Sequence, residues 1–438
     1  MKKIALSLAS VLVAAAFAPE ASALPVFARQ TGKACNSCHF QHFPLLNANG
    51  QDFKNSGFTQ VGAKGKFKGE DLSIPDNLNL GLFTTTYFQT QAHGKTAGVT
   101  DPVAVDKWGV PGTGGELSLF LGGRISEFAG FLAEAGLGGG AAAVGPAKLL
   151  MLFPVGEARF GPVIYTSPDQ GAAYSFETLN TGAAATHKMM GNGGPSDQHV
   201  KAAYAAQYLG TKTAATGINL VANNAMGFIN VGAYEMAGND LVGGANNLNL
   251  TYIRLASTMT MGDWETGFGI QNFGGKSTVT CADNVAMGTA TCAAGVTANA
   301  PKATVIDAQM QGALGDMPVG FYASYGTAPA GTATEINIFN PMASTGGAGT
   351  KSASSFNVSA ELGVVPHTTV QVALRMAKNG AATNDTDNAL MLGVTYDLAQ
   401  NISLSFHHTQ QSGSAWNEVG GSVPAGKDAN TLLLETVF

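Results

Sequence analysis

From Asn79 to the C-terminus, apolar side chains alternate with polar or small side chains in repeated segments of about ten residues. Clear examples are 81–88, 248–255 and 402–410. A period of two is typical of β-strands, because successive side chains point to opposite faces of a sheet. The pattern therefore predicts an extensive sheet in which each strand has one apolar face and one polar or small face.

The connections between these segments alternate between long loops and short turns. Long loops are predicted at 92–114, 138–146, 166–199, 237–246, 275–302, 327–354, 379–386 and 412–428. Short turns are predicted near Arg124, Gly156, Gly210, Gly262, Gly315, Pro366 and Asn401. Outer-membrane β-barrels combine long external loops and short periplasmic turns with an even number of strands. If 214–236 is one long strand, these connections join about sixteen strands and leave both ends of the barrel in the periplasm.

The composition agrees with a transmembrane barrel over 78–438. Charged residues make up 12% of the chain, where about 25% is usual, and 57 of the 438 residues are glycine. After residue 24, no apolar run reaches the roughly 18 residues of a membrane-spanning helix. The segment 431–438 alternates and ends on Phe438, which resembles the terminal strand signal of bacterial outer-membrane barrels. A soluble sandwich or propeller is the alternative, but so many weakly charged strands would be poorly soluble.

The N-terminal residues predict export. Two lysines precede an apolar run over 4–17, and small residues follow at 21–23. These features are typical of a signal peptide over 1–23, cleaved before Leu24. A membrane anchor is the alternative, but the apolar run is shorter than the roughly 20 residues that a spanning helix needs.

Residues 24–77 differ from the rest of the chain. Lysine and aspartate are frequent there, and the alternation of the later segments is missing. A segment of this length buries little apolar surface on its own. We expect a small α-helical domain that gains its stability from a covalent cofactor and from the barrel wall, as a plug or a cap of the barrel.

This N-terminal domain contains the motif Cys35-Asn36-Ser37-Cys38-His39. In C-x-x-C-H, two thiols form thioethers with the vinyl groups of haem, and the adjacent imidazole binds the iron. A redox dithiol and half of a zinc site are the alternatives. No βαβ pattern surrounds the motif, and no second Cys or His pair lies at zinc spacing. The sequence thus predicts one covalent haem c, with Cys35 and Cys38 as thioether donors and His39 as the proximal ligand.

The sixth ligand of that iron stays open. No methionine occurs between residue 24 and Met151, so the N-terminal domain cannot supply one. His42 would lie on the proximal side if the motif continued as a helix, where it is expected to pack against the haem propionates or to face water. His93, after the first strand, and His407, on the polar and luminal face of its strand, could approach from the barrel. The alternatives are that both are ordinary loop or pore-lining histidines and that the iron is five-coordinate or binds water.

Other chemistries have little support in the sequence. The net charge is −6 and there is no basic run, which argues against nucleic acid as a partner. No Ser/His/Asp set, phosphate-binding loop or paired-carboxylate signature stands out.

A resemblance to a known family rests on the residues around the haem motif. They are Leu24-Pro25-Val26-Phe27-Ala28-Arg29-Gln30-Thr31-Gly32, the motif itself, and Phe43-Pro44-Leu45-Leu46-Asn47-Ala48-Asn49-Gly50-Gln51-Asp52-Phe53-Lys54-Asn55-Ser56-Gly57-Phe58. This stretch resembles the fused outer-membrane monohaem cytochrome-porins of iron-oxidising bacteria. The resemblance implies a single haem on Cys35, Cys38 and His39 in a cytochrome domain that plugs the barrel. Relatives have a methionine where this chain has Gln60, so the resemblance implies no sixth ligand.

The same resemblance implies an iron oxidoreductase in the bacterial outer membrane. Extracellular ferrous iron would give one electron through the haem to a periplasmic c-type cytochrome or another acceptor, while outer-membrane lipid surrounds the barrel. Ferric iron is poorly soluble at neutral pH, so oxidation outside the cell keeps the precipitate out of the periplasm. The alternatives are a conduit with another donor or outward electron flow, and a diffusion porin with a structural haem. A terminal reductase usually needs several haems, and this chain has one C-x-x-C-H motif.

Cys281 and Cys292 bracket part of a predicted external loop that is rich in Thr, Ala and Gly. Two cysteines this close in an exported protein are expected to form a disulfide, with free thiols or metal ligation as the alternatives. We predict that neither thiol reacts with an alkylating reagent in protein isolated from the outer membrane until a reductant is added. Mass spectrometry of the loop peptide measures this, and full alkylation of both thiols without reductant would contradict it.

Overall fold

The computed structural model describes residues 25–62, 66–69, 73–75, 79–92, 94, 106–138, 143–182, 198–236, 247–277, 298–332, 334–342, 350–399, 401–419, 422 and 424–438. The predicted signal peptide, His93 and the Cys281–Cys292 pair lie outside these residues. No helix in the described ranges is both long and apolar enough to cross a bilayer.

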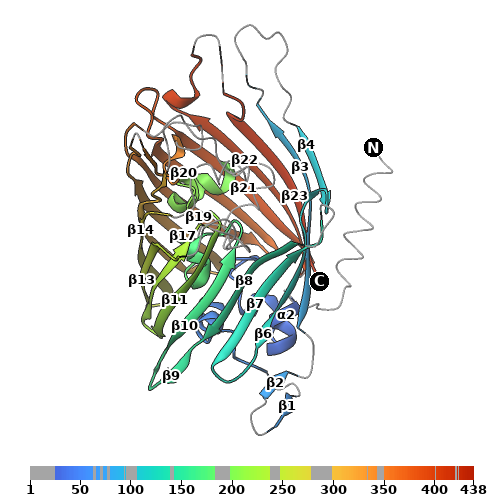
Figure 1. The fold of residues 1–438 in the computed structure, drawn as a ribbon. Helices are drawn as coiled ribbons and strands as arrows, with labels where there is room; N and C mark the ends of the chain where they lie inside the picture. The colour runs from blue at the N-terminus through green and yellow to red at the C-terminus, as the bar shows by residue number, and fades with distance from the viewer. Residues whose placement is uncertain are drawn as a thin grey trace, which may run out of the picture.

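Sixteen long strands close into an antiparallel barrel (Figure 1), as the alternation predicts. They are β3 (Leu80–Gln91), β6 (Leu117–Arg124), β7 (Ala129–Gly136), β8 (Ala143–Met151), β10 (Ala158–Ser167), β11 (Ala215–Asn224), β12 (Gly227–Glu235), β13 (Leu250–Met261), β14 (Trp264–Gly275), β16 (Ala303–Leu314), β17 (Met317–Ala328), β19 (Ala353–Val365), β20 (Thr368–Lys378), β21 (Asn388–Ala399), β22 (Ile402–Ser412) and β23 (Asp428–Val437). The last strand, β23, pairs with the first, β3, and Leu82 and Phe438 exchange two backbone hydrogen bonds of 2.7 and 2.8 Å. Closure leaves no strand edge to be covered.

Shorter strands and one helical turn complete the barrel and its loops. They are β4 (Lys107–Pro111), β5 (Gly114–Gly115), β9 (Phe153–Val155), the parallel pair β15 (Ala298–Asn299) and β18 (Glu335–Ile336), and η4 (Ser414–Trp416). The first barrel strand begins, and the last one ends, at the rim of the short turns. In outer-membrane barrels this rim faces the periplasm.

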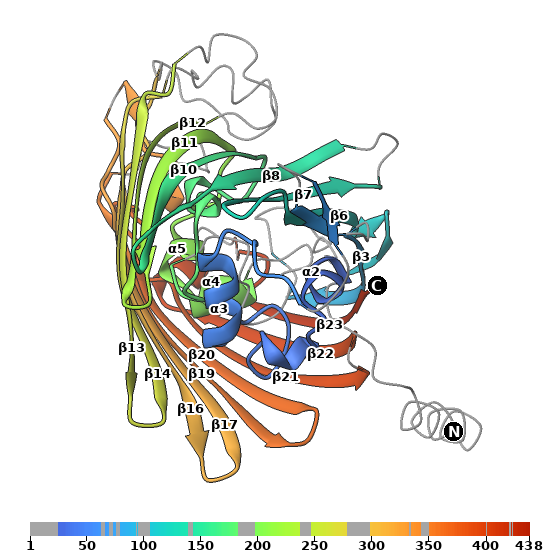
Figure 2. The same ribbon diagram turned by 90° about the horizontal axis from the view of Figure 1, so that it is seen from below.

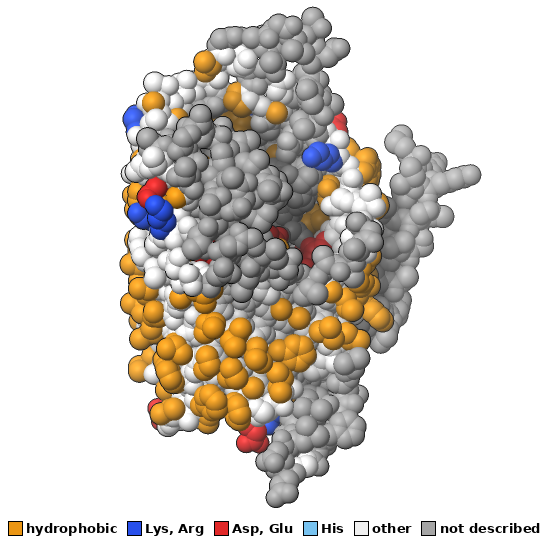
Figure 3. Space-filling model, in the orientation of Figure 1, with side chains coloured by type: hydrophobic (Ala, Val, Ile, Leu, Met, Phe, Trp, Pro, Cys, Tyr) orange, Lys and Arg blue, Asp and Glu red, His pale blue; other side chains and the backbone are white. Residues whose placement is uncertain are grey.

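The alternation of each strand separates a lipid-facing exterior from the lumen. In β20, Val370, Val372, Leu374 and Met376 are 38–58% exposed, and the side chains between them are buried inside the barrel. Outward-facing apolar side chains form a band across the lower half of the barrel in Figure 3. Such a band is where an outer-membrane barrel contacts the hydrocarbon of the bilayer.

The predicted number of strands is right, but two of the predicted elements are wrong and their errors cancel. The segment 214–236 is two strands, β11 and β12, joined by a tight turn. A two-residue turn, Ala225-Met226, does not interrupt the alternation of apolar residues, so the boundary was missed. The turn predicted near Gly210 is also wrong, because 198–208 is helical and belongs to one long connection between β10 and β11.

That connection folds into the barrel. It contains η2 (Ala172–Ser175), α4 (Gln198–Ala203) and α5 (Ala205–Tyr208), and Figure 2 shows α4 and α5 inside the ring of strands. Its alanines and tyrosines are buried against inward-facing side chains of strands β10 to β20. It is also tied to the wall, because Arg254 pairs with Asp307 and donates to the Thr181 carbonyl at 3.3 Å. The polar His199 of α4 is also satisfied by the wall, because its two ring nitrogens lie 2.6 and 2.8 Å from the hydroxyls of Thr409 and Thr431.

Residues 25–62 lie inside the same ring, toward the short-turn rim (Figure 2). They form α2 (Pro25–Thr31), η1 (Cys35–Ser37) and α3 (Ala48–Asn55). Leu45 is completely buried among side chains of α4 and the wall, and Phe53 and Phe58 pack on Leu150 and Leu152 of the wall. A small hairpin, β1 (Lys66–Lys68) and β2 (Ser73–Pro75), follows; no strand was predicted there.

Because the inward connection and residues 25–62 together fill much of the lumen, the barrel should conduct ions poorly. We predict that the intact protein in planar bilayers has a conductance several-fold lower than that of a variant lacking both 27–62 and 172–208. Heat-modifiable migration on gels checks that the variant is folded. Equal conductance of the two proteins would show that the lumen is open.

Candidate functional site

A cavity lies between residues 25–62 and one side of the barrel wall, and all three residues of the predicted haem site line it. The cavity is partly open to solvent. The wall side of the cavity is formed by Phe83, Glu116, Phe120, Leu132, Glu134, Pro146, Lys148, Thr395, Ser403, Ser405 and Glu435.

The cavity beside the motif is mainly aromatic and aliphatic. Residues 25–62 contribute Val26, Phe27, Phe43, Leu46, Phe53 and Phe58. Phe27 and Phe58 stack with ring centroids 4.9 Å apart. A flat, largely apolar macrocycle loses little by burial in such surroundings, and the hydrophobic effect favours it. The lining therefore fits haem.

The motif folds as a single tight turn. The backbone amides of Cys38 and His39 both donate to the Cys35 carbonyl, at 3.0 and 2.9 Å. Helix α3 packs directly against this turn, because a Cβ at Gly50 would lie 2.2 Å from the Cys38 carbonyl oxygen. Only glycine permits this approach. Burial raises the pKa of the Cys38 thiol, although Lys33 opposes the shift.

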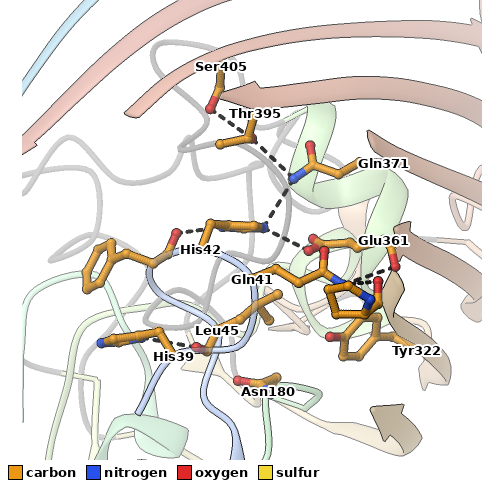
Figure 4. Close-up of polar contacts among 12 residues, drawn as sticks. His39, Gln41, His42, Leu45, Asn180, Tyr322, Glu361, Gln371, Thr395 and Ser405 are labelled. Carbon is orange, nitrogen blue, oxygen red and sulfur yellow. Dashed lines mark hydrogen bonds and ion pairs between the residues drawn. The ribbon is translucent and has the colours of Figure 1, made fainter. Parts of the chain in front are cut away.

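The His39 ring is oriented by a backbone carbonyl. Its Nδ1 lies 3.0 Å from the Leu45 oxygen and donates to it, which leaves Nε2 for a metal (Figure 4). Burial lowers the pKa of His39 to about 4, although the hydrogen bond that the ring donates to the Leu45 carbonyl opposes the shift, so the ring is neutral at pH 7. A metal-binding histidine needs a neutral ring and commonly donates its other nitrogen to a carbonyl in this way.

His42 does not lie where the helical assumption placed it. The chain after His39 is not helical, and Gln41 has a φ of 63°. His42 therefore turns toward the wall, where Nε2 lies 2.8 Å from Glu361 and Nδ1 lies 2.7 Å from the Phe43 carbonyl (Figure 4). Both nitrogens are engaged, so His42 is neither an iron ligand nor a group facing water.

His407 faces the lumen, as predicted, but away from the cavity. It is completely buried, and its Nε2 donates to Gln371 at 2.9 Å. Its ring centroid is 5.5 Å from that of His199 in α4. Gln60 donates to Asp52 at 2.7 Å and does not line the cavity. No sixth ligand is identified within the described part of the chain.

Two lysines of the cavity were not singled out by sequence reasoning. Lys54 lies on α3, and burial lowers its pKa to about 7 although Glu177 raises it. Lys148 lies on β8, donates to the Tyr174 carbonyl at 2.7 Å and sits 4.1 Å from the Tyr174 ring centroid. The sequence feature that points to Lys148 is its position as the one charged residue within the apolar run 146–152. Both lysines share the cavity lining with Glu116, Glu134 and Glu435.

Comparisons with known proteins leave the family open. No family model and no curated protein matches the chain. Among solved structures, it is similar to the outer-membrane channel DcaP of Acinetobacter baumannii, with 11% identity and a TM-score of 0.47 over 85% of this chain and 100% of that one. OmpF of Salmonella typhi, in complex with daunomycin, has the same identity, coverage and TM-score. OmpT of Vibrio cholerae, with 11% identity, has a TM-score of 0.45 over 85% of this chain and 100% of that one.

The His42–Glu361 contact predicts a pH dependence. Burial alone would lower the pKa of His42, but the Glu361 carboxylate raises it to about 9, above the ordinary value of about 6.5. The protonated pair stabilises the fold below pH 6.5, and this contribution is lost as the pH rises through about 9. At about 1.4 kcal/mol per pKa unit, the loss is on the order of 3 kcal/mol.

We therefore predict that the free energy of unfolding falls between pH 7 and pH 10 and that Glu361→Gln removes most of this fall. Urea unfolding of the detergent-solubilised protein measures it. Glu127→Gln is the matched control, because Glu127 forms an exposed ion pair with Arg124. An equal fall in all three proteins would rule out the His42–Glu361 pair as its source.

Proposed function

We propose that this chain is an outer-membrane electron-transfer cytochrome that oxidises extracellular ferrous iron and passes one electron, through a single haem c, to a periplasmic acceptor. One observation carries the proposal: Cys35, Cys38 and His39 line an aromatic cavity inside a closed membrane barrel. The position joins a haem attachment motif to a cavity whose aromatic lining suits haem.

The residues of the site have distinct roles in this proposal. Cys35 and Cys38 would hold the haem through two thioethers, and His39 would bind its iron. When bound, the haem supplies one-electron redox chemistry. The Leu45 carbonyl keeps the His39 ring in one orientation, and the surrounding phenylalanines exclude water. A one-electron transfer needs no general acid or base.

The filled lumen supports electron transfer over solute diffusion. Buried clusters join the inward connection to strands from β10 to β21, and the cavity lies beside the remaining strands. An electron can cross through packed protein and a cofactor, whereas a nutrient needs a continuous water-filled path. A diffusion porin with a structural haem is the second candidate, and the sixteen-strand barrel architecture favours it.

Ferrous iron as the donor rests on the resemblance over 24–58. The residues of the site suit a haem, but they do not indicate which electron donor reduces it. The donor therefore needs a direct test on purified protein.

We predict that ferrous iron reduces the haem of the purified, haem-loaded protein at near-neutral pH. Stopped-flow absorbance should show the change to the reduced spectrum, and His39→Ala should lose or greatly slow it because the proximal ligand is removed. His407→Gln is the matched control, since this luminal histidine lies away from the cavity, and it should react like the parent. A parent that stays oxidised under excess ferrous iron, while dithionite reduces it fully, would reject iron as the donor.

A further inference from the structure

Asn180 holds the backbone of residues 25–62 from inside the barrel. Its Oδ1 accepts from the Leu46 amide at 2.8 Å, and its Nδ2 donates to the Leu46 carbonyl at 2.8 Å. Asn180 is completely buried and belongs to the inward connection between β10 and β11. One side chain therefore satisfies both polar groups of a buried peptide residue, as buried backbone requires.

Asn180 is itself fixed to the barrel wall. Its backbone amide donates at 2.7 Å to Oε1 of Gln309, an inward-facing residue of β16. Strand β16 of the barrel wall therefore determines the position of Asn180.

The residue held by Asn180 is adjacent to the carbonyl that orients His39. The Leu45 oxygen accepts from the Phe40 amide at 2.9 Å and from His39 Nδ1 at 3.0 Å. The Leu45 side chain is buried among residues of α4 and of strands β17, β20 and β21. Figure 4 shows Asn180, Leu45 and His39 close together. The buried Leu45 side chain and the two hydrogen bonds that the Leu45 oxygen accepts therefore hold this carbonyl in one position.

We propose that Asn180 is a positioning residue for the proximal ligand, so that the barrel tunes the haem potential through the path Gln309, Asn180, Leu46, Leu45 and His39. This inference rests on the proposed function, since it needs the haem. A hydrogen bond from Nδ1 makes the imidazole more basic and a better ligand. A more basic ligand favours the oxidised iron and lowers the potential. Loosening the Leu45 carbonyl should therefore raise the potential.

The experiment compares Asn180→Ala and Gln309→Leu with the control Thr181→Val in haem-loaded protein. Thr181→Val removes a buried bond between the same connection and the wall without touching residues 25–62. Three readouts are measured: haem content by pyridine haemochrome, midpoint potential by redox titration, and hydrogen–deuterium exchange of the peptide that contains Leu46. The potential and the exchange separate positioning from a general loss of stability.

Asn180→Ala should keep its haem, lose exchange protection at Leu46 and favour the reduced state by about tenfold, which is about 59 mV for a one-electron couple. Gln309→Leu should shift the potential and the exchange at Leu46 in the same direction, but by a smaller amount. Thr181→Val should match the parent in both. If Asn180→Ala does not fold, Gln309→Leu carries the test.

Two results would overturn the inference. A potential unchanged in Asn180→Ala and Gln309→Leu, or one shifted equally in Thr181→Val, would show that Asn180 does not act on His39. A parent that carries no covalent haem would instead overturn the proposed function. In that case the exchange of Leu46 alone would still report whether Asn180 holds residues 25–62.

Discussion

Leu45 lies in a fully buried pocket formed by the inward connection and the barrel wall, and this contact determines the depth of residues 25–62 in the lumen. From this anchor, the Leu45 carbonyl reaches His39, and Asn180 holds the adjacent residue. The turn with the two cysteines then lines the cavity that strands β3, β6, β7 and β8 border. The position of the site is thus a consequence of packing within the lumen.

Period-two alternation was sufficient to predict the barrel, its closure and its lipid-facing exterior, because each strand must present opposite faces to lipid and lumen. The alternation gave wrong elements where a turn preserves the period of two and where the chain is helical. A two-residue turn kept the alternation intact across β11 and β12. The residues between the predicted loop 166–199 and the predicted turn near Gly210 imply a strand, but this alanine-rich segment is helical inside the barrel. Haem attachment at Cys35, Cys38 and His39 remains a prediction from local spacing. The cavity, Asn180 and Lys148 come from segments more than a hundred residues apart, and no local pattern reports such contacts.

The interior of the barrel also determines which chemistry is plausible at the site. The His42–Glu361 pair and the Arg254–Asp307 pair are buried, and each charge has a partner, as a low-dielectric interior demands. The cavity beside them is aromatic near the motif and carries Lys54 and Lys148 farther along its lining. The aromatic part of this lining suits the apolar ring of a haem. A solute pore would need a continuous polar path in place of the packed clusters.

The central claim is that one haem is covalently bound in this cavity, and the intact mass of protein purified from the outer membrane tests it most directly. We predict the mass of the chain beginning at Leu24 plus one haem, with a pyridine haemochrome spectrum of the two-thioether type. The Cys35→Ser/Cys38→Ser double variant should have the mass of the chain alone. A parent mass without haem, with both thiols of the motif open to alkylation, would contradict the claim.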